Sequence, residues 1–118
     1  MIEAIDHVQL AAPAGCEEEA RRFFGELCGL EEIPKPKPLA ARGGVWFRCG
    51  SQQLHIGVEQ EFAPSRKAHP AFRLGSPDDL RLLAGRIGDV RWDDELPGHE
   101  RFYASDPFGN RLEFLAAR

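Results

Sequence analysis

Two stretches decide the fold that this sequence predicts: QLHIGVE at residues 53–59 and RLEFLA at residues 111–116. In both, apolar residues alternate with polar ones, which is typical of a β-strand that buries one face. Successive side chains of a strand point to opposite sides, so His55 and Glu113 lie on the faces away from the apolar residues. The same pattern, read outward from these strands, organises the whole chain.

The two halves of the chain repeat one order of elements: strand, helix, strand, strand, strand. His7 matches His69, and LHI at 54–56 matches LEF at 112–114. Strands are predicted at 5–13, 45–49, 53–59, 69–74, 90–94, 101–105 and 111–116, helices at 15–28 and 76–88, and an extended loop at PKPKP, 34–38. The sequence therefore predicts one domain over 1–118, built from modules at 1–60 and 67–118.

Composition restricts the class of protein. The chain has 118 residues, 42% hydrophobic and 29% charged, with a net charge of −4. No stripe of Lys and Arg is interleaved with aromatic residues, which argues against a nucleic-acid partner. No apolar run approaches the ~20 residues that cross a bilayer, and no signal peptide is recognised. Three cysteines without CxxC spacing favour free, mostly buried thiols and a cytoplasmic location.

Four potential metal ligands occupy equivalent positions in the two halves. Each module has one amphipathic helix, which covers the apolar face of its own sheet. The opposite faces carry His7, His55, His69 and Glu113, and closing these faces into a cupped eight-stranded sheet would bring the four together. Imidazole and carboxylate donors suit a divalent ion such as Zn²⁺, Fe²⁺, Mn²⁺, Ni²⁺ or Co²⁺.

Each polar residue singled out here also has a purely structural interpretation. A single histidine on a half-exposed strand is more often a solvated side chain than a ligand. Agreement of all four positions between the repeats favours the metal site. The segment Asp93–Glu95 is interpreted as a solvated strand end, and Cys49 as an unreactive thiol. Substrate contacts are predicted for residues that share the ligand-bearing faces: Gln9, Trp46, Arg48, Gln53, Arg73 and Tyr103.

Three motifs carry a family resemblance that spans essentially the whole chain. They are IDHVQLA at 5–11, FFGELCGL at 23–30 and FYASDPFGNRLEFL at 102–115, with DPFGNRLE at 106–113 the most specific. The chain thereby resembles the vicinal oxygen chelate superfamily, which includes glyoxalase I, extradiol dioxygenases, fosfomycin-resistance thiol transferases and bleomycin-resistance proteins. The resemblance implies an α+β fold of tandem βαβββ modules with the helices outside, and a homodimer.

The resemblance also implies roles for particular residues. The family's ligand positions map onto His7, His69 and Glu113. His55 stands where glyoxalase-like members have a glutamate that is both ligand and base, so it is predicted to be the fourth ligand or the base. Tyr103 matches a tyrosine that fosfomycin-type enzymes use near the substrate oxygens, whereas Gln9 replaces their threonine. Bleomycin-type binders have lost the ligands that this chain retains.

The sequence thus predicts an enzyme that depends on a divalent metal ion and acts on a small, oxygen-rich substrate. Its reaction would be of the lyase, dioxygenase or thiol-transferase type, with His55 and Glu113 as the catalytic residues. The alternative is a metal-free protein of the same fold that binds a small molecule or antibiotic. Neither reading involves nucleic acid or a membrane.

Overall fold

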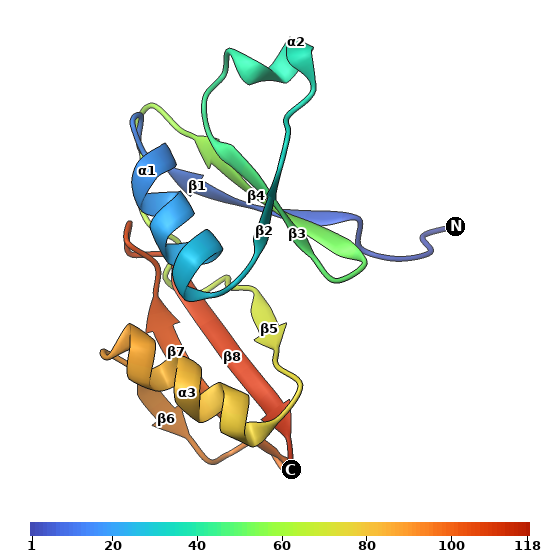
Figure 1. Cartoon of the computed structure of the whole chain (residues 1–118), viewed down its shortest axis with the longest axis vertical. Helices are drawn as coiled ribbons and strands as arrows, with labels where there is room; N and C mark the ends of the chain where they lie inside the picture. Colours follow the sequence, from blue (N-terminus) through green and yellow to red (C-terminus); the bar gives the residue numbers. More distant parts are fainter. The chain divides into compact units, whose positions relative to one another are not determined.

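The computed structural model describes all 118 residues and divides the chain into two compact units, Met1–Pro64 and Ser65–Arg118. Each unit contains one four-stranded sheet. In both sheets the four strands of the unit lie in the same order: first, fourth, third, second. In each sheet the first and last strands of the unit pair in parallel, and the other pairs are antiparallel. The predicted α+β fold of tandem βαβββ modules is therefore confirmed, with its eight strands divided into two sheets (Figure 1).

The first sheet consists of β1 (His7–Ala12), β2 (Glu31–Ile33), β3 (Val45–Cys49) and β4 (Gln52–Val58). Between β1 and β2 runs a continuous helix, of which α1 (Glu17–Ala20) is the α-helical start and η1 (Arg21–Leu27) is wound as a π-helix. Gly29 has φ +81°, the left-handed conformation that ends helices and that only glycine adopts readily, so the predicted stop is confirmed.

Two features of this unit were not predicted correctly. The PKPKP segment was predicted to be an extended loop, but α2 (Lys37–Ala40) begins within it. Pro36 is the residue before the helix and Pro38 lies in its first turn, where no backbone N–H is needed, so proline is compatible with this start. Strand β2 was required by the repeat but not located, because three residues with two glutamates show no periodicity.

The second sheet consists of β5 (Ala71–Arg73), β6 (Arg91–Asp93), β7 (His99–Ser105) and β8 (Arg111–Ala117). Helix α3 (Pro77–Ile87) contacts β7 and β8. Its start is the predicted one: the Ser76 hydroxyl accepts a hydrogen bond from the Asp79 backbone N–H at 3.1 Å. Gly88 ends the helix with φ +86°.

The core of each unit lies between its helix and one face of its sheet. In the first unit Phe24 of η1 and Phe47 of β3 are buried with their ring centres 6.0 Å apart. In the second unit Phe102 and Phe114 stack at 5.1 Å, and Leu80 of α3 is fully buried. Along the strands, Phe114 alternates with the predicted ligand Glu113. Phe47 and Phe102 adjoin the predicted contact residues Trp46 and Tyr103, so the helix-free face of each sheet carries the predicted site residues.

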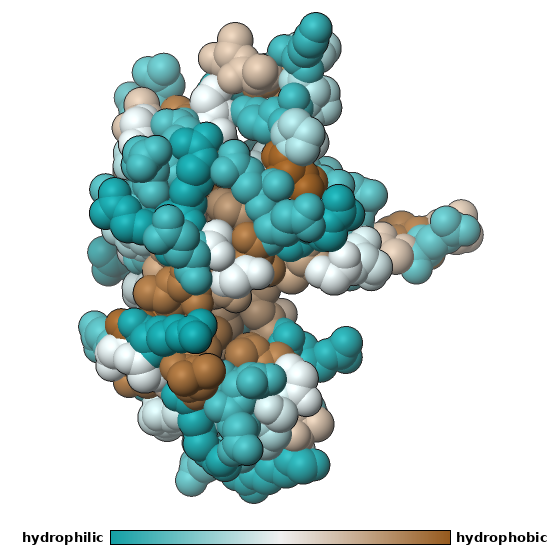
Figure 2. Space-filling view, viewed as in Figure 1, coloured by the Kyte–Doolittle hydropathy of each residue, from teal (hydrophilic) through white to brown (hydrophobic).

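The surface over α3 mixes hydrophilic and hydrophobic side chains, as Figure 2 shows. Among the large apolar residues, Leu82 of α3 and Trp92 of β6 are well exposed. No helix in the structure combines the length and apolar character that a membrane span requires. All three cysteines are free, and burial raises the pKa of the Cys28 thiol to about 12, which fits the predicted unreactive thiols.

Candidate functional site

The strand register places the predicted ligands at equivalent positions in the two sheets. On the first sheet His55 lies opposite Gln9, two residues after His7. On the second, Glu113 lies opposite Ala71, two residues after His69. An aromatic residue faces the donor of the central strand in each sheet: Trp46 is opposite His55, and Tyr103 is opposite Glu113. Each unit therefore presents one pair of donors and one aromatic ring on its helix-free face.

In the first unit three rings form a continuous stack. The Trp46 and His55 rings are parallel within 2°, with centres 3.7 Å apart. The His7 ring stacks on the other face of His55 at 4.3 Å and 19°. Because the three residues come from adjacent strands β3, β4 and β1, the sheet itself holds the stack. His55 is only 4% exposed, whereas His7 lies at the exposed end of the stack.

Hydrogen bonds select one nitrogen of each ring in this unit. His55 Nε2 donates to Gln53 Oε1 at 2.8 Å, which leaves the lone pair on Nδ1. His7 Nδ1 lies 2.9 Å from the Asp6 carboxylate and donates to it, which leaves Nε2 free. Burial lowers the pKa of His55, and the nearby His7 lowers it further, so the His55 ring is neutral at pH 7.

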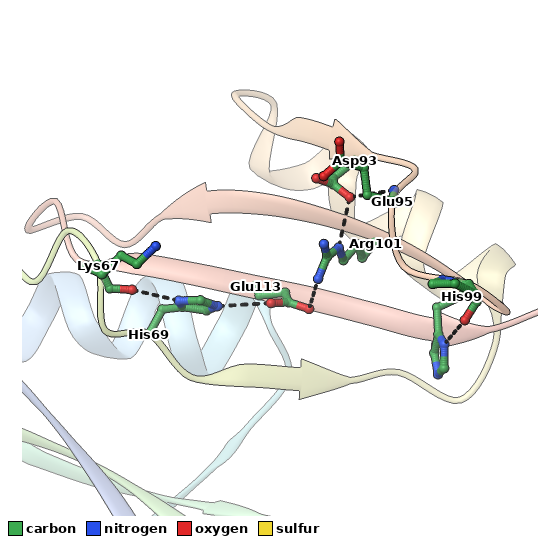
Figure 3. Close-up of polar contacts among 8 residues, drawn as sticks. Lys67, His69, Asp93, Glu95, His99, Arg101 and Glu113 are labelled. Atoms are coloured by element: carbon green, nitrogen blue, oxygen red, sulfur yellow. Dashed lines mark hydrogen bonds and ion pairs between the residues drawn. The ribbon is translucent and has the colours of Figure 1, made fainter.

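In the second unit His69 and Glu113 form the other donor pair (Figure 3). His69 Nδ1 lies 3.0 Å from the Lys67 carbonyl oxygen, which can only accept, so the proton of the neutral ring is on Nδ1. His69 Nε2 lies 3.0 Å from Glu113 Oε1. A proton on Nε2 makes this contact an ion pair with the carboxylate, and without that proton the nitrogen is free to ligate a cation next to the same oxygen.

Glu113 is held by a chain of contacts that crosses the second sheet. Arg101 Nη1 donates to Glu113 Oε2 at 3.3 Å, and Arg101 Nε donates to Asp93 Oδ1 at 3.1 Å (Figure 3). The Glu95 backbone N–H donates to the same Asp93 oxygen and, with Arg101, lowers the pKa of Asp93. Asp93 is therefore an anchor for Arg101 rather than the solvated strand end that the sequence predicted.

Arg101 was not recognised from the sequence as part of the site. The alternation of β7 would have indicated it, because Arg101 lies two residues before Tyr103 and on the same face. Its choice of partners depends on the pairing of β6 with β7, which places Asp93 directly opposite Arg101.

The remaining predicted contact residues occupy the helix-free faces as expected from the strand alternation. Gln9 is exposed, and its side-chain amide covers Gly57, where an added Cβ would lie 2.7 Å from Gln9 Cδ. Arg48 is exposed and lies 3.5 Å from the Glu31 carboxylate. Arg73 is exposed and has no ion-pair partner, while Tyr103 is half-buried and makes a T-shaped contact with the His69 ring, with the ring centres 5.6 Å apart. Within neither unit do three His, Cys, Asp or Glu side chains gather closely enough to hold a metal ion.

The most specific motif of the sequence, DPFGN at 106–110, stabilises a turn. Asp106 Oδ1 accepts the backbone N–H groups of Phe108 and Asn110, each at 2.9 Å, and its Oδ2 accepts from the Asn110 side-chain amide at 2.8 Å. Asn110 Oδ1 in turn accepts the Ser65 backbone N–H at 2.9 Å. This turn sets the start of β8, and thus the position of Glu113, without supplying a ligand.

Comparison with solved structures establishes the family. A protein from Bacillus anthracis assigned to the glyoxalase family is 55% identical over 100% of this chain and 98% of its own, with a TM-score of 0.95. The lactoylglutathione lyase from Agrobacterium tumefaciens is 20% identical over 98% and 94% of the two chains, with a TM-score of 0.76. The fosfomycin resistance protein FosX from Listeria monocytogenes, solved with Mn(II) and dihydroxypropylphosphonic acid, is 17% identical over 100% and 95%, with a TM-score of 0.80.

This chain belongs to the glyoxalase family, within the vicinal oxygen chelate superfamily, whose members are largely metal-dependent enzymes. The predicted resemblance is thereby confirmed. The two more distant structures support the fold alone. No protein-family model matches the chain, and no match was found among curated proteins.

Proposed function

We propose that this chain is a divalent-metal-dependent enzyme that acts on a small, oxygen-rich substrate, with His7, His55, His69 and Glu113 as the metal donors. The observation that supports it most directly is the contact between His69 Nε2 and Glu113 Oε1 at 3.0 Å, with the ring proton engaged by a backbone carbonyl. With Nδ1 engaged by the carbonyl, Nε2 is the nitrogen of His69 that can ligate a cation, and it lies beside a carboxylate oxygen that can ligate the same ion.

The donor set fits such an ion chemically. Ligating histidines usually donate their second ring N–H to a carboxylate or a backbone carbonyl, which orients the ring and increases its basicity. His7 has this bond to Asp6, and His69 has it to Lys67. Imidazole nitrogens with one carboxylate suit Zn²⁺, Fe²⁺, Mn²⁺, Ni²⁺ or Co²⁺, and the related FosX was solved with Mn(II).

A divalent ion held by these residues would polarise adjacent substrate oxygens and stabilise negative charge that develops on them. The protein's own residues have distinct tasks in this proposal. Arg101 keeps the Glu113 carboxylate oriented, and the neutral His55 ring is available as a fourth ligand or as a base near pH 7. Trp46 fixes the plane of that base by stacking on it.

Substrate contacts in the proposal come from the side chains around the donors on the two helix-free faces: Gln9, Trp46, Arg48, Gln53, Arg73 and Tyr103. The reaction is of the lyase, dioxygenase or thiol-transferase type. The proposal includes the homodimer and the cytoplasmic location that the sequence predicts.

Metal analysis of protein purified without chelator tests the proposal. We expect about one equivalent of a first-row divalent metal per chain in the wild type and its loss in His69→Ala. His99→Ala is the matched control, because His99 Nδ1 also bonds the carbonyl two residues earlier, that of Pro97, but has no carboxylate partner (Figure 3). Equal metal content in the two variants would refute the proposal. A wild type without metal that binds a drug-like ligand would favour the metal-free binding protein.

A further inference from the structure

The guanidinium group of Arg111 is the one cationic group on the second sheet that is both partly buried and without a hydrogen-bond acceptor. Arg111 begins β8 on the same face as Glu113, two residues away. Its Nε atom is buried and has no hydrogen-bond partner. Its guanidinium carbon lies 4.4 Å from the centre of the Tyr103 ring, so the ring supports one face of the group. Buried N–H groups in native proteins almost always have an acceptor, so a buried donor without a protein acceptor points to a ligand that supplies one.

The neighbouring arginines on the same face show why Arg111 differs. Arg101 is also near Tyr103, at 5.3 Å, but its charge is paired with Asp93 and Glu113. Arg73 and Arg91 are unpaired but exposed, so water solvates them. Arg111 alone combines desolvation, a rigid aromatic support and a free donor edge.

We propose that Arg111, supported by Tyr103, binds the carboxylate or phosphonate group of the substrate. A guanidinium presents parallel N–H donors that match the two oxygens of such a group, and a stacked guanidinium loses little freedom on binding. Two residues on one strand face are about 7 Å apart along the strand, so the bound anion lies a few bonds from the oxygens near Glu113. The substrate is thus a small molecule with an anionic group beside its adjacent oxygens. This last step rests on the proposed function.

The binding of an anion can be tested without metal and without a known substrate. Full-length protein, stripped of metal and dialysed free of chelator, is labelled with ¹⁵N-arginine, and the Arg111 Nε–H signal is assigned by its absence in Arg111→Gln. Methylphosphonate and acetate are then titrated separately. We expect a saturable shift of this signal with at least one probe, and the tighter of the two identifies the substrate's anionic group.

The matched control is Arg91→Gln, which removes the same charge from the same face of the same sheet, because Arg91 lies opposite Tyr103 and is exposed. Arg91→Gln should leave the affinity of the probe within twofold of wild type, while Arg111→Gln weakens it at least tenfold, measured on backbone amides of β7 and β8. The absence of a saturable shift with either probe, or equal weakening in both variants, would overturn the subsite. If Arg111→Gln does not fold, Arg111→Lys takes its place in both the signal assignment and the titration.

The result is readable whatever the metal analysis gives. Anion binding by a protein that holds no metal would support the Arg111 subsite and refute the proposed metal-dependent enzyme. Metal binding without a shift of the Arg111 signal would support the metal-dependent enzyme and refute the Arg111 subsite.

Discussion

Substitution of Gly44 by alanine tests how the first sheet holds the ring stack. Gly44 has φ +89°, and a Cβ there would lie 2.1 Å from the Ile56 carbonyl oxygen. That oxygen belongs to β4 immediately after His55, and Gly44 immediately precedes β3, so the overlap can be relieved only by moving one strand from the other. The substitution therefore acts on the pairing that aligns Trp46 with His55.

The expected loss has two parts. An alanine in the left-handed region costs about 1–2 kcal/mol, and relief of an overlap with backbone in a packed region costs about 1–3 kcal/mol more. Gly50→Ala is the matched control, because Gly50 has φ +60° but nothing within 4 Å of an added Cβ. Gly50→Ala should therefore show only the cost of placing alanine in the left-handed region. Against a typical total of about 5–15 kcal/mol, the difference between the two variants is large enough to measure.

Urea unfolding of the metal-free protein, followed by circular dichroism, measures both variants. With an m-value of about 1–3 kcal/mol per M, Gly44→Ala should unfold at a urea midpoint roughly 1 M below that of Gly50→Ala. The tryptophan emission of the folded state should also change in Gly44→Ala but not in Gly50→Ala. Equal midpoints for the two variants would refute the inference that a Cβ at residue 44 overlaps the backbone of β4.

Two further predictions concern groups outside the donor pairs. The Gly44 backbone N–H donates to Glu17 Oε2 at 2.7 Å, and this bond lowers the pKa of Glu17 from its ordinary value of 4.5. The ionised carboxylate therefore stabilises the fold at pH values above 4.5. Glu17→Gln should cost about 1 kcal/mol at pH 7, and the difference from wild type in urea unfolding should shrink as the pH falls below 4.5; a difference constant from pH 7 to pH 3 would contradict this. Asp106→Ala deprives three N–H donors of their acceptor and should cost about 3 kcal/mol or more. Metal content per folded chain should nevertheless match that of wild type, and a selective loss of metal would show that DPFGN does more than form a turn.

The repeat and the placement of the donors could be predicted because they rest on local periodicity. A strand's side chains alternate whatever it pairs with, so the alternation in QLHIGVE already assigns His55 to the polar face. Matching His7 with His69 and His55 with Glu113 needed only the spacing of these strands along the chain, and the register of both sheets agrees.

The errors arose where the pattern was short or where a rule was applied at the wrong position. Strand β2 has three residues, too few for alternation to show, and it is defined by its pairing with β3. Helix α2 was excluded because of its prolines, although proline is excluded from helix interiors and not from the first turn.

The sequence by itself determined which residues can be donors and which face of each strand they occupy, because both follow from residue type and a two-residue period. Only the tertiary structure decided which atoms meet. That His69 directs Nε2 at Glu113 depends on the carbonyl of Lys67, and that Arg101 is neutralised while Arg111 is not depends on where β6 pairs with β7. Lys67 is a neighbour of His69 in the chain, but the strand pairings that bring Glu113 to His69 and Asp93 to Arg101 join separate segments, and no local pattern encodes them.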